Sequence, residues 1–194
     1  MFERIVDPLR VLLQRHHELY SGQCKAEYWE ELCSKALITA GYGSDWKPDF
    51  NHTVGVDQST DTGAKISNKG GSLKNKILTI SGSRLTKHKT IEEKVDFISL
   101  HHEDYIFCLA TDKDEWDSSK PVYNLIIIDS RSLDYKSATW IETYAQRGKQ
   151  QGKCNGWITS LAKGFVAKIV MSMSHQLWID IDSELFIEEY RIEL

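Results

Sequence analysis

Hydrophobic residues recur at helical intervals through the first 40 positions. One pattern spans residues 2–20 and breaks at Ser21-Gly22. A second runs from about Lys25 to Ala40 and stops at Gly41, a residue suited to ending a helix. The apolar positions are Ile5, Leu9, Leu12, Leu13 and Leu19 in the first, and Trp29, Leu32, Cys33, Ala36, Leu37 and Ala40 in the second. Two N-terminal helices are therefore predicted.

The pattern then changes to short β runs. Residues 53–57 and 64–69 flank Ser59 to Gly63, which supply the small polar residues and glycine of a turn. We expect a β-hairpin that Gly70-Gly71 ends. In its second strand, Ser67 and Lys69 should share one face, because successive side chains alternate.

Further apolar runs predict a strand at 77–80, buried strands at 105–110 and 122–129, and strands at 167–173 and 176–181. Thr90 and Glu93 have capping-box spacing, which predicts a helix from there to about His101. Residues 112–119 should form a surface loop, 138–146 a short helix and 146–156 a polar loop. Together these elements predict an α/β fold with a central mixed sheet flanked by helices.

Length and composition fit one domain over residues 1–194, because 41% hydrophobic residues can fill a core. We find no apolar run of the roughly 20 residues that span a bilayer, and no signal-peptide pattern at the N-terminus. The cysteines at 24, 33, 108 and 154 lack zinc-ligand spacing. We interpret them as reduced thiols, which predicts a cytoplasmic protein without a membrane partner.

Charge is unevenly distributed around the net value of −4. Residues 63–94 contain eight Lys or Arg and two acids. Residues 144–168 contain five Lys or Arg and no acid. Residues 175–194 contain six acids and one Arg. Two basic segments in an acidic chain indicate a localised phosphate-binding face, although ordinary exposed lysines are the alternative.

The candidate chemistry lies in the predicted hairpin. Asp57 ends its first strand, and Ser67-Asn68-Lys69 follow after nine intervening residues. This order and spacing resemble the PD-(D/E)xK nucleases, which include most type II restriction endonucleases, and Gly55-Val56-Asp57 is similar to the Mrr-like branch. The resemblance implies a restriction-endonuclease-like core at about 25–130, with Asp57, Ser67 and Lys69 as catalytic residues. Asp49 follows a proline, but no lysine-bearing strand comes directly after it.

Ser67 occupies the place of the family's second acid. The family also has an aromatic-Glu pair on its first core helix, matched by Trp29-Glu30, and Glu30 is thus a candidate catalytic and metal-binding residue. Glu92 or Glu93 resembles the relocated acid of Ser-x-Lys enzymes, although both can simply cap a helix. The implied cofactor is Mg²⁺, which takes one or two protein carboxylates.

The family resemblance also implies double-stranded DNA as partner and a homodimer, with residues 131–194 serving DNA binding or assembly. Arg, Asn and Gln can read base edges, and Lys and Arg contact phosphates. The candidate DNA-binding residues are Arg84, Lys87, His88, Lys89, Arg147, Lys149, Gln150, Gln151, Lys153 and Asn155. The alternative for residues 147–155 is a solvated loop without a role in DNA binding.

The sequence leaves three readings open: a type II restriction endonuclease, a repair or mobile-element nuclease, and a non-catalytic DNA-binding protein that retains the fold. Ser67 keeps the last of these open. The pairs His16-His17 and His101-His102 do not suit a metal site, because helical neighbours point about 100° apart. No G-K-[ST] phosphate loop is present, so we expect no nucleotide cofactor.

Overall fold

The computed structural model describes residues 1–48, 55–112, 114–160 and 163–194. They form three α-helices and a mixed sheet of ten strands, which confirms the α/β class. The helices are α1 (Val6–Leu19), α2 (Ala26–Thr39) and α3 (Ile91–Ile98). The strands are β1 (Gln58–Ser59), β2 (Lys65–Lys74), β3 (Ile77–Arg84), β4 (Tyr105–Asp112), β5 (Val122–Asp129), β6 (Trp140–Tyr144), β7 (Cys154–Thr159), β8 (Phe165–Val170), β9 (Gln176–Asp182) and β10 (Phe186–Glu193).

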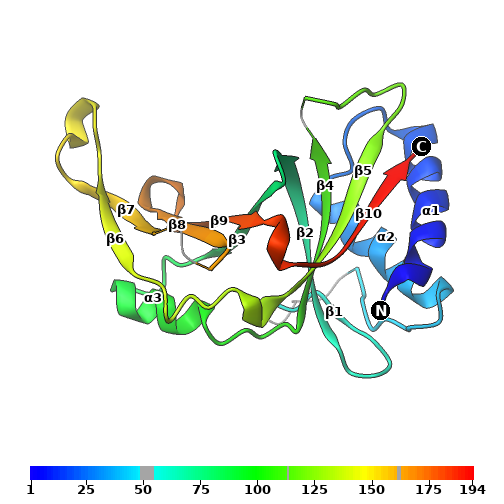
Figure 1. Cartoon of the computed structure of the whole chain (residues 1–194), viewed down its shortest axis with the longest axis horizontal. Helices are drawn as coiled ribbons and strands as arrows, with labels where there is room; N and C mark the ends of the chain where they lie inside the picture. The colour runs from blue at the N-terminus through cyan, green and yellow to red at the C-terminus, as the bar shows by residue number, and fades with distance from the viewer. Residues whose placement is uncertain (49–54, 113, 161–162) are drawn as a thin grey trace.

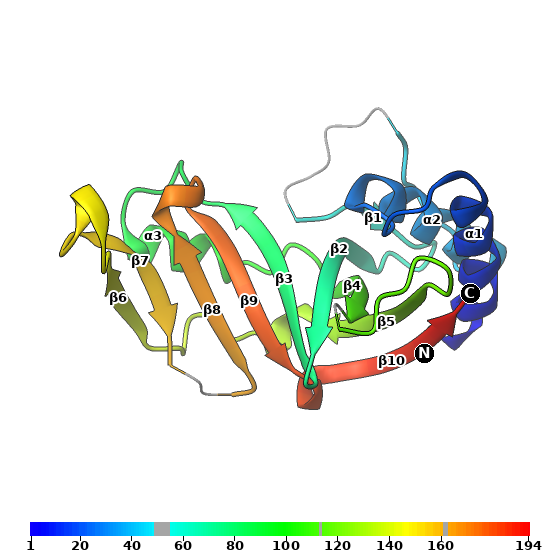
Figure 2. The ribbon, with the colours of Figure 1, turned by 90° about the horizontal axis from the view of Figure 1, so that it is seen from above.

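The sheet runs in the order β10-β5-β4-β2-β3-β9-β8-β7-β6, and β1 pairs with β2. β2 and β4 pair in parallel, whereas the other described pairs are antiparallel. Figure 2 shows this order as an arc in which β2 stands between the helix-covered strands and the strands of the far end. β2, which carries the candidate catalytic residues Ser67 and Lys69, is therefore central.

Both predicted N-terminal helices are confirmed, and they cover one face of β4, β5 and β10 (Figure 1). Leu9, Leu13 and Trp29 are completely buried there, among Phe107 and Leu125 of the sheet. The Trp29 indole donates a hydrogen bond to the Phe107 carbonyl at 3.2 Å. The helical apolar stripes thus build the first of two cores.

The second core occupies the opposite face of the sheet and is covered in part by α3. The predicted capping box is present: Thr90 accepts from the Glu93 backbone, and Glu93 accepts from the Thr90 backbone. The helix ends at Ile98, earlier than the predicted His101. His101 has a φ of +43°, which a right-handed helix does not accommodate.

Three local predictions were wrong. Residues 140–144 form β6 and not a helix, because their β-branched and aromatic side chains pair with β7 and Trp140 packs on the second core. Gly70-Gly71 lies inside β2 and does not end it. The first hairpin strand is only Gln58–Ser59: residues 55–57 are not a strand, and Asp49, Thr53 and Val54 lie outside the described residues.

The remaining predicted strands are confirmed within a few residues of their expected ends. The predicted polar loop at 146–156 is confirmed only to residue 153, because residues 154–156 already belong to β7. Residues 145–153 form the tip of the β6–β7 hairpin, which projects from the far end of the sheet (Figure 1). No helix in the described ranges has the length and apolar character needed to cross a bilayer.

Candidate active site

Asp57 is fixed to β2 through both its backbone and its side chain. Its backbone N–H donates to the Ile66 carbonyl at 2.9 Å, which extends the short β1–β2 ladder. Its Oδ2 accepts the Asn68 backbone N–H at 2.6 Å and the Ser67 hydroxyl at 3.3 Å. β3 pairs with β2 only from Gly71 onward, so the Asp57 carboxylate fills the gap between the two ladders.

Ser67 and Lys69 project from the same face of β2, as the alternation predicts. The Lys69 Nζ lies 4.0 Å from Asp57 Oδ2, and these two side chains are only 28% and 13% exposed. The structure therefore brings together three of the four residues predicted to be catalytic. Both hydrogen bonds that the Asp57 carboxylate accepts from the described residues use Oδ2, so among these residues Oδ1 has no hydrogen-bond partner.

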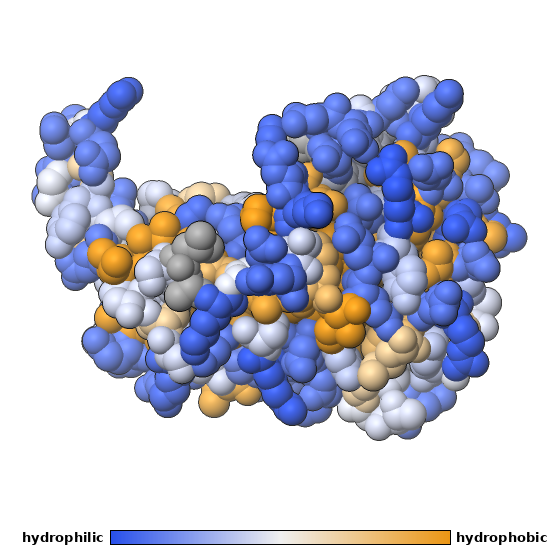
Figure 3. All heavy atoms as spheres, viewed as in Figure 1, coloured by the Kyte–Doolittle hydropathy of each residue, from blue (hydrophilic) through white to orange (hydrophobic). Residues whose placement is uncertain are grey.

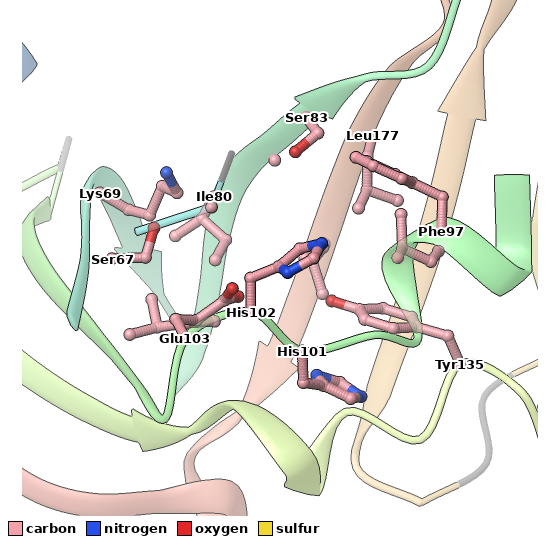
Figure 4. A pocket seen from close by; sticks show the side chains of 15 residues that line it. Ser67, Lys69, Ile80, Ser83, Phe97, His101, His102, Glu103, Tyr135 and Leu177 are labelled. Atoms are coloured by element: carbon pink, nitrogen blue, oxygen red, sulfur yellow. The ribbon is translucent and has the colours of Figure 1, made fainter. Parts of the chain in front are cut away.

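Glu103, which the sequence did not suggest, supplies a second carboxylate to this site. It lies on the segment that leads into β4 and lines a pocket together with Ser67 and Lys69 (Figure 4). The chain passes close to it at Gly55: a Cβ built there would be 2.9 Å from Glu103 Oε2, and the φ of Gly55 is +83°. Glycine thus allows the segment that carries Asp57 to approach Glu103.

Burial is the main cause that raises the pKa of Glu103 above its ordinary value of 4.5. The Asp57 charge raises this pKa further. The backbone N–H of Glu103 itself, Lys69 and His102 act to lower it. Two carboxylates and one ammonium give the ionised site a net charge of −1 when His102 is neutral. A partly buried site with this charge is suited to a cation.

The pocket lies between β2, β3, α3 and the segment before β4, and has a free volume of about 60 Å³. A water molecule needs about 10–15 Å³ by this kind of measure, so several waters fit. His101 stacks on Tyr135 with ring centroids 5.7 Å apart, and burial lowers the pKa of its imidazole. The pocket is thus polar on the β2 side and lined on the other by aromatic and aliphatic groups, among them Tyr135, Phe97 and Leu177 (Figure 4).

No model of a known protein family matches this chain, and a search of curated proteins finds no match either. Its candidate function consequently rests on the chemistry and geometry of its own residues.

The other predicted acids lie outside this group. Glu93 is exposed and accepts from the backbone of Lys89 and Thr90, which lowers the pKa of its carboxyl. This arrangement is the capping role that the sequence left open. Glu92 is exposed on the same turn, and Glu30 is half-buried on α2, which covers the opposite sheet face from Ser67 and Lys69.

One predicted basic segment borders the pocket. Gly82 and Ser83 line it, the exposed Arg84 ends β3, and the exposed Lys87 and Lys89 follow in the connection to α3. The buried Lys94 ammonium holds this connection by donating to the His88 carbonyl. His88 itself packs against Phe97, with ring centroids 4.5 Å apart, so its side chain has a packing role.

The second basic segment is remote from the pocket in the sheet. Arg147, Lys149, Gln150, Gln151, Lys153 and Asn155 are exposed on the β6–β7 hairpin. β3, β9 and β8 separate β7 from β2, a span of roughly 19 Å at the usual strand spacing. Asn155 accepts from the Thr143 hydroxyl at 2.8 Å, which ties it to β6. Figure 3 shows the hydrophilic tip of this hairpin standing apart from the body.

Asp57 and Glu103 have the oxygen donors that Mg²⁺ prefers, and in the part of the chain that the structure describes Asp57 Oδ1 accepts no hydrogen bond. The described residues contain no group of three or more His, Cys, Asp or Glu side chains that could hold a metal. Two carboxylates are nevertheless enough for Mg²⁺, which keeps several of its waters. The donor set therefore fits a hydrated magnesium ion and not a fully protein-enclosed metal.

Proposed function

We propose that this protein is a Mg²⁺-dependent endonuclease that hydrolyses phosphodiester bonds in double-stranded DNA, as a type II restriction endonuclease does. The observation that carries the proposal is that Ser67, Lys69 and Glu103 line one pocket, and that the Asp57 carboxylate contacts both Ser67 and Lys69. A carboxylate pair with an adjacent ammonium, held on rigid strands, is suited to activating water beside a phosphate.

Each side chain has a distinct role in this proposal. Asp57 and Glu103 would hold the metal ion. When bound, magnesium supplies charge neutralisation at the scissile phosphate and lowers the pKa of water. Lys69 orients the attacking water and stabilises negative charge that builds on the phosphate oxygens. Ser67 cannot carry charge, and its hydroxyl instead fixes the Asp57 carboxylate.

The basic residues give this site access to DNA. Arg84, Lys87 and Lys89 stand beside the pocket and would contact phosphates near the cleaved bond. The β6–β7 hairpin would contact the duplex farther along, where its Arg, Asn and Gln side chains can read bases. We further propose a two-fold homodimer, since such symmetry matches palindromic sites.

The test is incubation of the purified protein with plasmid and phage DNA, in magnesium and in EDTA. Discrete magnesium-dependent fragments are expected from the wild type. Asp57→Asn, Lys69→Met and Glu103→Gln should each abolish them. Lys65→Met is the matched control, because Lys65 is an exposed lysine on the same strand and the same face of β2. Wild-type activity in Asp57→Asn or Glu103→Gln would refute this site.

The non-catalytic reading remains the second candidate, and Ser67 at the position of an acid is the observation that favours it. It predicts DNA binding that is independent of divalent metal, without cleavage in Mg²⁺ or Mn²⁺. Electrophoretic mobility shifts measured beside the cleavage assay separate these two functions. A repair or mobile-element nuclease would cut without the discrete fragment pattern.

A further inference from the structure

A second recess lies on the face of β2 opposite Ser67 and Lys69. It is an open groove of about 390 Å³, within the range of small-molecule sites. The sheet residues that line it come from β2, β3, β4, β5 and β9, and Gln23 and Cys24 of the connection between α1 and α2 also line it. Figure 3 shows the molecule hollowed between the β6–β7 hairpin and the body that carries these helices.

Gly70 lies in the lining of this groove, and neither backbone conformation nor packing requires a glycine at this position. Gly70 pairs with Leu109 in a parallel ladder that runs without a shift from Ile66 to Leu73. A glycine inside a central strand weakens it, and marks a bulge, a bend or a place where a ligand approaches. Gly70 has no bulge and no positive φ, and nothing lies within 4 Å of an added Cβ.

The neighbouring glycine provides the contrast. A Cβ on Gly71 would lie 2.6 Å from the Cys108 sulfur and 2.9 Å from Leu78, so close packing in the second core explains that residue. Packing does not explain Gly70. Its missing side chain keeps the floor of the groove open.

The described lining is uncharged and rich in hydrogen-bonding groups. It offers the hydroxyls of Ser72, Thr79, Ser81 and Thr111, the Gln23 amide and the aromatic surface of Trp178. The Tyr123 hydroxyl already accepts from the Cys24 backbone at 2.8 Å. Burial raises the pKa of the Cys24 thiol to about 12, so this thiol is neutral at pH 7. Such a lining disfavours phosphates and other ions.

We propose that this groove binds a nucleobase, with the base above Gly70 and against Trp178 and its polar edge facing the hydroxyls and Gln23. Aromatic side chains stack on the flat face of any base, and Ser, Thr and Gln can bond its edge. The base can come from a free nucleoside or from a single strand of nucleic acid. The groove and the candidate active site use opposite faces of β2, so this inference does not rest on the proposed cleavage.

The experiment is isothermal titration of the full-length protein, in EDTA, with adenosine, guanosine, cytidine and thymidine, and with a short single-stranded oligonucleotide. Glucose serves as an uncharged, hydroxyl-rich comparison. Gly70→Val should weaken binding at least tenfold by filling the groove, and Trp178→Leu should also weaken it. Asp57→Asn should leave binding unchanged, which separates this site from the proposed nuclease.

Folding of the variant is checked by thermal unfolding. Valine suits a strand and an added Cβ meets no atom within 4 Å at this position, so Gly70→Val should melt at or above the wild-type temperature. Gly71→Val should melt lower, because of its clash with Cys108. Nucleoside binding identifies a free ligand, whereas binding of the oligonucleotide alone identifies a base on a strand. Glucose binding without nucleosides, or binding that Gly70→Val does not weaken, would overturn the proposal.

Discussion

The Asp57 carboxylate combines two roles: it accepts hydrogen bonds from β2, and it provides negative charge to the candidate active site. Comparing Asp57→Ala with Asp57→Asn separates these roles. Oδ2 accepts from the backbone of Asn68, a residue only 3% exposed, and from the Ser67 hydroxyl. Hydrogen bonds to charged groups contribute about 1.5–3 kcal/mol, and neutral ones about 0.5–1.5 kcal/mol. Asp57→Ala leaves the Asn68 N–H without its acceptor. Asp57→Asn keeps a neutral oxygen at the same place.

We therefore expect Asp57→Ala to lower the free energy of unfolding by about 2 kcal/mol and Asp57→Asn by about 1 kcal/mol. For a chain of this size, 2 kcal/mol corresponds to a fall in Tm of about 4–8 °C. Both variants should lose cleavage completely despite this difference in stability.

The assay is urea unfolding at pH 7 in EDTA, followed by circular dichroism, beside cleavage in magnesium. EDTA removes any contribution of metal binding to the stability of the wild type. If Asp57→Ala unfolds within about 0.5 kcal/mol of the wild type, the carboxylate does not bridge the gap in the ladder. If Asp57→Ala loses stability but keeps cleavage, Asp57 is structural and the active-site assignment fails.

Further predictions concern the remaining charged residues. The raised pKa of Glu103 means that the folded protein holds this proton more tightly than the unfolded chain, so stability is lost as pH rises above 4.5. At pH 7 in EDTA, Glu103→Gln should thus unfold at a higher urea concentration than the wild type. At pH 4 the two proteins should unfold at the same urea concentration. If the variant is more stable than the wild type by the same amount at both pH values, the charge on Glu103 is not the cause. Glu93→Gln should retain cleavage, because glutamine also completes a capping box; loss of fragments would restore Glu93 as a metal ligand. Lys87→Ala with Lys89→Ala should lower the slope of log K against log salt for duplex binding by about 1.8, whereas Lys35→Ala, on the helix-covered side, should leave it unchanged. Equal slopes for the double variant and the wild type would remove these lysines from the DNA interface.

Local patterns in the sequence determined much of the secondary structure. The apolar stripes of the first two helices, the alternation along β2 and the capping box at Thr90 depend on neighbours within a few residues, and the structure confirms them. The same locality explains the errors. Residues 140–144 became a strand because β7 pairs with them, and Gly70-Gly71 stayed in a strand because β4 pairs with both glycines and β3 also pairs with Gly71.

The candidate site likewise contains residues that the sequence pattern selected and one that only the tertiary structure reveals. Spacing along the chain was enough to select Asp57, Ser67 and Lys69, since a hairpin brings residues ten apart into contact. Glu103 lies 46 residues beyond Asp57, and it reaches the pocket only because β4 pairs in parallel beside β2 and aligns Tyr105 with Ile66. Partner strand, direction and register are chosen by the packing of the whole sheet on its two cores. That choice of partners, which no local pattern contains, decided where the second carboxylate lies and which face of β2 was left open at Gly70.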